Sequence, residues 1–120
     1  MSNQIQIVSS NIGALSNASR AVFKVPAGHG GITILEAKVV GAGAGTSWLT
    51  LDDLGTAGTS VSTRIGTGGT AISVANVPQA ITLTAANVFV DAGHYVGFTE
   101  MNVGACNTVT IVDIAYKWGK

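Results

Sequence analysis

The sequence predicts an all-β fold, specifically an antiparallel β-sandwich, from three observations. Short segments rich in Val, Ile, Thr and aromatic residues recur along the chain, and clusters of Gly, Asn and Asp separate them. No window of roughly eleven residues or more has the 3.6-residue apolar period of an amphipathic helix. A chain of 120 residues holds one hydrophobic core and forms one domain. The expected strands are Gln4–Ser10, Ala21–Val25, Ile32–Val40, Ser47–Asp52, Ser60–Ile65, Thr70–Ser73, Gln79–Leu83, His94–Met101 and Thr108–Trp118.

The ends of these strands follow from the glycine, proline and asparagine residues between them, which favour turns. Two of the breaks share the pattern V-x-A-G-H, at Val25–His29 and Val90–His94, and an expected strand follows each. We expect Gly28 and Gly93 to adopt a positive φ there, because glycine has no Cβ to oppose it. The shared pattern indicates two turns of the same kind, since two short copies do not make a repeat protein.

Two of the expected strands carry apolar side chains on both faces. In Thr108–Trp118 the period of two puts Val112, Ile114, Tyr116 and Trp118 on one face, and Val109, Ile111, Asp113, Ala115 and Lys117 on the other. In Ile32–Val40 it groups Leu35, Ala37 and Val39 on one face, and Ile32, Ile34, Glu36, Lys38 and Val40 on the other. Such strands indicate cover by another layer or another chain, unless a β-bulge switches the alternation within the strand.

Charged side chains are scarce, at 10% of residues with a formal net charge of zero. A soluble domain of this size commonly carries about 25% charged residues. No Asp, Glu, Lys or Arg occurs in Met1–Ser19 or in Ile65–Val90. We therefore expect a surface that other subunits cover, with Ile65–Val90 contributing to a shared interface. The sequence divides into an extended N-terminal arm, residues 1–20, and a sandwich domain, residues 21–120, and Ile5 and Ile7 are the candidate anchoring residues of the arm.

The remaining composition limits the class of partner. Six basic and six acidic side chains are scattered singly, so there is no electrostatic footprint for nucleic acid or an anionic membrane. The first residues lack the basic and apolar regions of a signal peptide, so synthesis in the cytoplasm is expected. The single cysteine, Cys106, excludes an intrachain disulfide.

The residues that could carry chemistry do not form a recognisable site. His29 and His94 occupy equivalent turns, but no third metal ligand has a suitable spacing, so turn or strand-edge roles are expected. Asp52 and Asp53 could bind Ca²⁺, but adjacent carboxylates at the end of a strand more commonly accept backbone hydrogen bonds. Cys106 has no legible base beside it. We expect no catalytic residue, no cofactor and no metal site, and hence no enzyme.

Aromatic side chains are the other candidates for binding. Trp48, Tyr95, Phe98, Tyr116 and Trp118 could stack on a sugar or a base. However, Trp48 and Phe98 alternate with polar residues in strands, as core aromatics do. Tyr116 and Trp118 are better candidates for contact with another subunit, because aromatic residues concentrate in interface cores. We expect a core or interface role for them. The candidate interface residues are Tyr116, Trp118, Ile32, Ile34, Val109 and Ile111.

Two stretches of the chain carry a resemblance to a known family. Phe89–Gly119 (FVDAGHYVGFTEMNVGACNTVTIVDIAYKWG) resembles the closing pair of strands of jelly-roll domains. Together with Val22–Thr46 (VFKVPAGHGGITILEAKVVGAGAGT), it resembles small Gly/Thr-rich virion proteins of tailed bacteriophages, particularly capsid decoration (cement) proteins. The resemblance is one of texture and strand rhythm. It implies a jelly-roll that forms a homotrimer on the outer capsid surface and bridges major capsid protein subunits.

The sequence therefore predicts a structural virion protein, synthesised in the host cytoplasm and located on the capsid surface. The alternative is a carbohydrate-binding or receptor-binding β-sandwich module of a phage tail or fibre, which would need exposed aromatic side chains beside polar loops. A tail-tube or tail-tip subunit is a neighbouring structural possibility.

Overall fold

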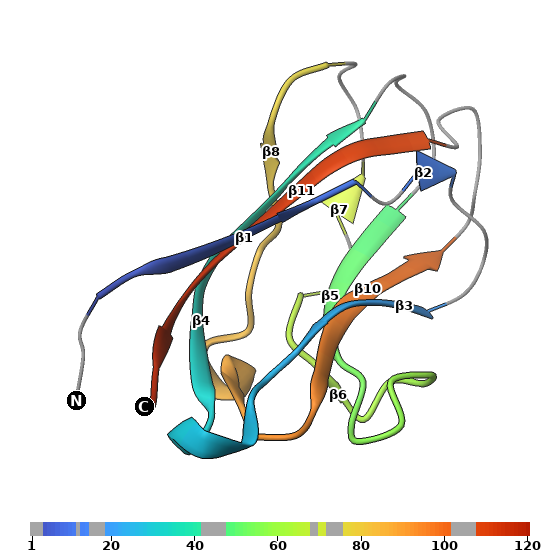
Figure 1. The fold of residues 1–120 in the computed structure, drawn as a ribbon. Helices are drawn as coiled ribbons and strands as arrows, with labels where there is room; N and C mark the ends of the chain where they lie inside the picture. Colours follow the sequence, from blue (N-terminus) through green and yellow to red (C-terminus); the bar gives the residue numbers. More distant parts are fainter. Residues whose placement is uncertain are drawn as a thin grey trace.

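The fold is known from a computed structural model, which describes residues 4–11, 13–14, 19–41, 48–67, 70–71, 76–101 and 108–120. It consists of two antiparallel sheets packed against each other (Figure 1). The predicted fold class, an all-β antiparallel sandwich, is confirmed. The helical segments in the described ranges are two 3₁₀ turns, Ala27–His29 and Ala85–Asn87.

Sheet A contains the longest strands. Its order is β1, β11, β4 and β8, with β2 pairing β11 and β9 pairing β4. The bounds are Gln6–Ser10 for β1, Gly13–Ala14 for β2, Ile32–Gly41 for β4, Gln79–Ala80 for β8, Phe89–Val90 for β9 and Thr108–Trp118 for β11. All of these pairs are antiparallel, and β11 and β4 form the longest pair.

Sheet B forms the second layer. Its order is β3, β10, β5 and β6, with β7 also pairing β5. The bounds are Ser19–Lys24 for β3, Trp48–Asp53 for β5, Thr63–Arg64 for β6, Thr70–Ala71 for β7 and Tyr95–Met101 for β10. Two strands are shorter than predicted, because β6 keeps two residues of the expected Ser60–Ile65 and β8 keeps two residues of the expected Gln79–Leu83. β7 begins at Thr70 as predicted, and the part of the expected Thr70–Ser73 after Ala71 lies outside the described residues.

The N-terminal segment does not form a separate arm over its described residues. β1 pairs with β11 from Gln6, opposite Tyr116, to Ser10, opposite Val112. β2 continues along the same strand, and β3 begins at Ser19 in sheet B. The predicted boundary between an arm at residues 1–20 and a sandwich from residue 21 is therefore wrong for these segments, which belong to the sheets. β1 lies at the edge of sheet A (Figure 1).

A β-bulge explains why β4 is apolar on both sides in the sequence. Ala115 of β11 lies opposite Glu36, but the next residue, Tyr116, lies opposite Ile34, so Leu35 is the extra residue. The inward positions therefore switch phase at Leu35, with Ile34 buried before it and Ala37 buried after it. Leu35 is exposed, so its predicted place on the same face as Ala37 is wrong. The bulge, rather than cover by another chain, accounts for this strand.

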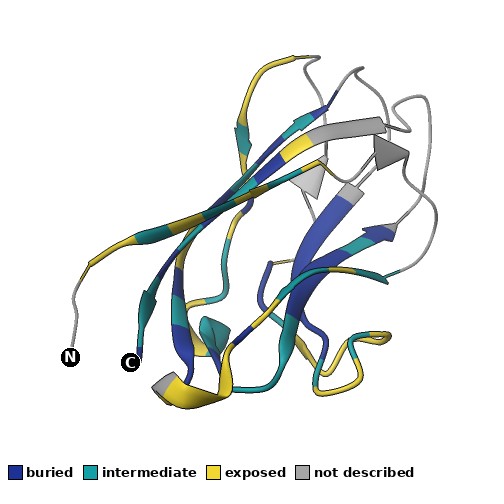
Figure 2. Cartoon of the chain, viewed as in Figure 1, coloured by how far each residue is buried: buried dark blue, intermediate teal, exposed yellow. Residues whose placement is uncertain are grey.

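The hydrophobic core lies between the two sheets (Figure 2). Its fully buried members come from both layers, among them Phe98, Leu49 and Leu51 of sheet B. Val112 and Ile114, which the period of two places on the same face of β11, are both 0% exposed and belong to this core. Burial of these aliphatic and aromatic side chains is the main stabilising contribution to such a sandwich.

The turns follow the sequence in part. Gly93 has φ 85°, as the V-x-A-G-H pattern predicts. In the first copy of the pattern the positive φ occurs two residues later, at Gly30 with 70°, and Gly28 is not in the left-handed region. The 3₁₀ turn Ala27–His29 causes this shift, because Gly30 ends it as the left-handed C-cap.

Candidate interaction surface

Exposed apolar side chains concentrate on the outer face of sheet A. The described chain has six exposed large hydrophobic residues. Three of them lie in β1, β4 and β11, and a fourth directly precedes β1. These four are Ile5, Ile7, Leu35 and Ile111. Ile7 is 68% exposed and Ile5 is 59% exposed, the highest values of the six. The remaining two are Val61 and Val77, which lie in connecting segments.

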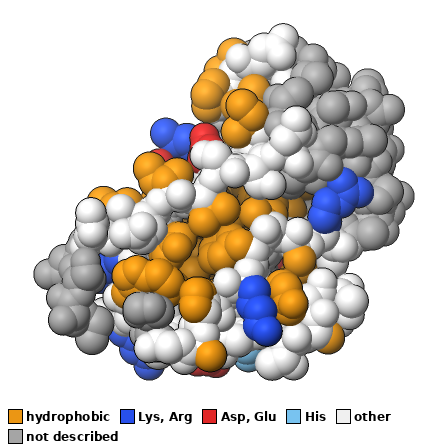
Figure 3. Space-filling view, viewed as in Figure 1, with side chains coloured by type: hydrophobic (Ala, Val, Ile, Leu, Met, Phe, Trp, Pro, Cys, Tyr) orange, Lys and Arg blue, Asp and Glu red, His pale blue; other side chains and the backbone are white. Residues whose placement is uncertain are grey.

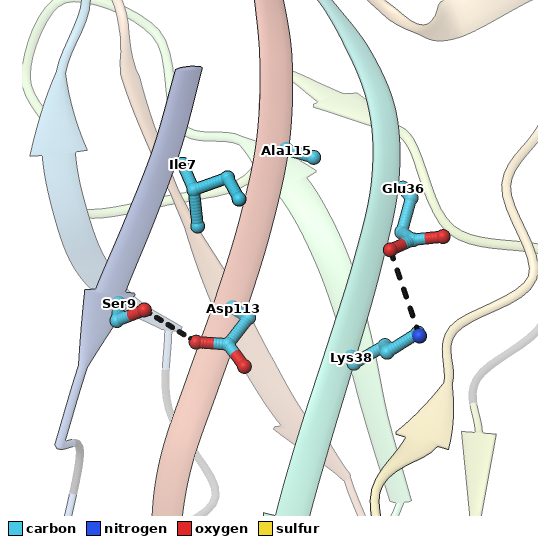
Figure 4. A pocket seen from close by; sticks show the side chains of 6 residues that line it. All are labelled: Ile7, Ser9, Glu36, Lys38, Asp113 and Ala115. Atoms are coloured by element: carbon cyan, nitrogen blue, oxygen red, sulfur yellow. Dashed lines mark hydrogen bonds and ion pairs between the residues drawn. The ribbon is translucent and has the colours of Figure 1, made fainter. Parts of the chain in front are cut away.

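The strand register arranges this face in two cross-strand rows. In one row Ile7 lies opposite Ala115, which lies opposite Glu36. In the other row Ser9 lies opposite Asp113, which lies opposite Lys38. Because side chains in register on one face of a sheet are neighbours, β1, β11 and β4 together present these six groups side by side (Figure 4).

These six residues line a shallow groove with a volume of about 340 Å³. The methyl side chain of Ala115 lies on the central strand, between the larger side chains of Ile7 and Glu36 (Figure 4). The groove is therefore apolar only at Ile7 and Ala115, and Ser9, Asp113, Glu36 and Lys38 make the rest of it polar. Apolar and polar groups occur side by side in this way at sites of protein contact.

The polar groups of the groove form local contacts. The Ser9 hydroxyl donates to Oδ1 of Asp113 at 2.5 Å. Nζ of Lys38 lies 3.6 Å from Oε1 of Glu36, and both side chains are about half exposed, at 44% and 58%. A solvent-exposed pair of this kind contributes at most about 1 kcal/mol to stability, so its charges can be re-paired by a partner.

A second apolar surface lies between the edges of the two sheets. Phe23 of β3 stacks on Tyr116 of β11, with ring centroids 5.6 Å apart, and Tyr116 meets Trp118 edge-on at 5.5 Å. In Figure 3 hydrophobic side chains gather over the region between β1 and β3. Phe23 and Trp118 are partly buried and pack against the core, and Tyr116 is 9% exposed. This cluster closes the open side of the sandwich.

The predicted interface residues divide into four groups. Ile32 and Ile34 are 0% and 2% exposed and belong to the core, so their predicted interface role is wrong. Tyr116 and Trp118 point to the inner side of sheet A, where they pack in the aromatic cluster. Ile111 is 45% exposed on the outer face. The backbone of Val109 lies in β11, but its side chain is outside the described residues.

The candidate arm residues Ile5 and Ile7 are exposed at the edge of sheet A, where Ile7 lines the groove. Sequence reasoning missed the groove residues Ala115, Glu36 and Lys38 as neighbours of this segment. The alternation in β11 is the signal that places Ala115 and Asp113 on one face, but strand order cannot be read from it.

His94 and the adjacent carboxylates Asp52 and Asp53 stabilise loops of sheet B. Nδ1 of His94 lies 2.9 Å from Oδ1 of Asp53, which also accepts the Gly55 N–H at 2.8 Å. Asp52 is 0% exposed, and its carboxylate accepts Nε–H of Arg64 at 3.1 Å.

Three further carboxylates lie in different parts of the fold. Asp113 is on the outer face of sheet A, Asp91 is exposed in the turn before β10, and Glu100 is buried in β10 of sheet B. Within the described ranges no three His, Cys, Asp or Glu side chains are grouped to hold a metal ion. The side chain of His29 and residue Cys106 lie outside the described part of the chain.

None of the helices in the described ranges has the length and hydrophobicity needed to cross a membrane. Comparison of the chain with protein-family models, curated proteins and solved structures gives no match.

Proposed function

We propose that this chain is a structural subunit that works by association, as a decoration protein on the capsid of a tailed bacteriophage. The observation that carries the proposal is the concentration of exposed apolar side chains on the outer face of sheet A, around Ile7 and Ile111. An apolar patch of this kind on a domain with few charges is favourable when another protein covers it. The patch is the candidate contact with the major capsid protein.

Sheet B supports the same assignment by contrast. Across β3 and β10 the register aligns the hydroxyl residues Ser19 and Thr99, which are partly exposed and share a hydrogen bond of 3.0 Å. None of the exposed large hydrophobic residues of the described chain lies in a strand of sheet B, so sheet A has the more apolar outer face. A decoration protein needs this difference, because one side meets the shell and the other meets solvent.

Mass action supplies the mechanism. A subunit that binds only the assembled shell stabilises the shell by its binding free energy, so many weak contacts accumulate over a symmetric lattice. We propose that copies also associate with one another, as the homotrimer implied by the resemblance does. No catalytic group is required for this function.

The carbohydrate-binding alternative has less support from the geometry. The six residues that line the groove include no aromatic side chain on which a sugar could stack. Trp118 lies on the inner side of sheet A in contact with Tyr116. Glycan binding that Trp118→Ala removes, with folding intact, would favour this alternative over the structural one.

Co-sedimentation with capsid shells tests the proposal. Shells of the encoding phage, stripped of this protein, are incubated with the wild type and with Ile111→Lys, which places a charge in the apolar patch. We expect the wild type to pellet with the shells and Ile111→Lys to lose at least about tenfold in affinity, because burying an unpaired charge is costly.

Val61→Lys is the matched control. Val61 is also an exposed hydrophobic residue, at 36%, but lies in the segment between β5 and β6. The Val61→Lys variant should bind shells as tightly as the wild type. Failure of the wild type to bind shells, or equal losses in the two variants, would overturn the assignment of this face.

A further inference from the structure

β1 is an edge strand that lacks the usual protection against pairing. It ends the strand order of sheet A, and in the described part of the chain it pairs only with β11. Natural edge strands are commonly blunted by charged residues, by proline or by short length. Gln4–Ser10 contains no charged residue and no proline. Among the described strands, no neighbour pairs with β1, residues Gln6–Ser10, on the side away from β11, so a further strand can pair there.

The other edges of the sandwich differ from β1 in this respect. β3 carries Arg20 and Lys24, and β6 carries Arg64 within only two residues. β8 also has two residues and follows Pro78. Among the described edges, β1 therefore combines useful length with an uncharged sequence.

We propose that β1 pairs, antiparallel and around a two-fold axis, with β1 of a second copy of this chain. Antiparallel pairing continues the pattern of sheet A, in which all neighbours are antiparallel. The pair is self-complementary because a two-fold axis makes each strand meet the same sequence in reverse. The proposal rests on the associative function argued above and adds the partner and the contact to it.

The side-chain alternation of β1 fits this partner. A two-fold axis at Gln6 places Ile5 opposite Ile7 of the second copy, and an axis at Ile7 places the two Ile7 side chains opposite each other. Both registers pair residues on the same face of the sheet, as β-pairing requires. The two most exposed hydrophobic side chains of the described chain are then covered on one side. Val8, partly buried on the core side, gains a neighbour as well.

A second copy is a better partner than an unrelated strand for two reasons. β1 has no charged residue that would favour a partner of opposite charge, and pairing with itself buries apolar side chains against apolar side chains. The contact joins copies in twos. It gives a dimer from single chains and a hexamer from trimers.

The test measures mass in solution without any shell. Size-exclusion chromatography with light scattering, from about 10 μM to about 1 mM protein, covers the range expected for a small interface. We expect the wild type to reach an even multiple of the 12.1 kDa chain mass at high concentration. Ile7→Lys should halve that mass, because the introduced charge would lie against Ile5 of the second copy with the axis at Gln6, or against the same charge with the axis at Ile7. Ile111→Lys changes the same face away from the edge and should keep the wild-type mass.

Cysteine cross-linking locates the axis. In a Cys106→Ser background, Gln6→Cys or Ile7→Cys, whichever lies on the axis, should form a disulfide-linked dimer on mild oxidation. Ile111→Cys is the control, because two copies of β11 across the joined sheet lie about 15 Å apart, three strand spacings. That separation is beyond the roughly 7 Å limit for a disulfide.

A wild type that stays at one chain mass, or at three, throughout this range would overturn the proposal. So would an even-numbered assembly that Ile111→Lys dissociates and Ile7→Lys does not. These outcomes are independent of shell binding. A protein that binds shells without pairing through β1 retains the proposed function and rejects the two-fold contact, and the reverse result rejects only the function.

Discussion

Nδ1 of His94 lies 2.9 Å from Oδ1 and 3.1 Å from Oδ2 of Asp53, and this contact joins the turn before β10 to the end of β5. Asp53 has a side-chain exposure of 8%, and its Oδ1 also accepts the Gly55 N–H. His94 thus has a structural role, because its imidazole holds the turn before β10 against a largely buried carboxylate.

Replacing this histidine tests that role. His94→Ala removes the partner of a largely buried carboxylate, so we expect the free energy of unfolding to fall by about 1–2 kcal/mol. Urea unfolding followed by circular dichroism measures the change. Asp91→Ala, an exposed change in the same turn, should stay within about 0.5 kcal/mol. Equal effects of the two variants would contradict the proposed tie.

Gly97 lies at another β-bulge, between β10 and β3. A Cβ at this position would lie 2.1 Å from the Arg20 carbonyl oxygen and 2.8 Å from Cα of Ala21. We expect Gly97→Ala to destabilise the fold by about 3 kcal/mol, because backbone of the neighbouring strand has to move. Gly28→Ala is the control, since a Cβ there meets nothing within 4 Å. Thermal melting of both variants checks the prediction, and an unchanged melting temperature for Gly97→Ala would contradict it.

The bulge in β4 makes neighbouring residues respond in opposite ways. Ile34 is 2% exposed and Leu35 is 41% exposed. We expect Ile34→Ala to cost about 2–5 kcal/mol through lost burial and a cavity, while Leu35→Ala changes stability by no more than about 0.5 kcal/mol. Denaturant unfolding of the pair distinguishes the bulge from regular alternation. If Leu35→Ala proved the more damaging of the two, the bulge would be misplaced.

The Arg64 guanidinium stabilises the Asp52 carboxylate. The carboxylate is fully buried and accepts hydrogen bonds from Nε of Arg64 at 3.1 Å and from the Thr50 hydroxyl at 3.0 Å. Arg64→Met should lower the free energy of unfolding by about 1–2 kcal/mol, a value reduced because the Arg64 side chain is 39% exposed.

Lys38→Met provides the comparison for Arg64→Met. Lys38 also pairs with a carboxylate, but both partners are solvated, so a change below about 0.5 kcal/mol is expected. Chemical unfolding of both variants under the same buffer conditions makes the test. A loss for Lys38→Met as large as that for Arg64→Met would show that burial of Asp52 is not the cause.

Much of the architecture is legible in the sequence because it depends on local patterns. The expected strand Thr108–Trp118 coincides with β11, and the alternation within it places Val112 and Ile114 on one face, where both are buried. Ile32–Val40 matches β4 to within one residue. Side chains alternate with a period of two in any strand, so these features do not depend on which strands become neighbours.

The candidate surface is less legible, because it depends on strand order and on one extra residue. Ile34 and Leu35 are both apolar, so the sequence does not show which of them faces the core. The strand register does, because Tyr116 pairs with Ile34 and Ala115 pairs with Glu36, which leaves Leu35 as the extra, outward residue. The sequence shows only that Ile7 is an apolar residue in an uncharged segment. Ile7 lines the groove because β1 pairs with β11, which cannot be read from the sequence.

The sequence by itself determined the fold class, the scarcity of charge and which residues of β11 share a face, because composition and alternation do not depend on the neighbours of a strand. Only the tertiary structure decided that Ile32 and Ile34 are core residues and that Ile7 and Ile111 are exposed on one sheet. It also placed β1 at an edge of sheet A instead of in a separate arm. The physical reason is that exposure is a property of neighbours, and the neighbours of a strand come from distant parts of the chain.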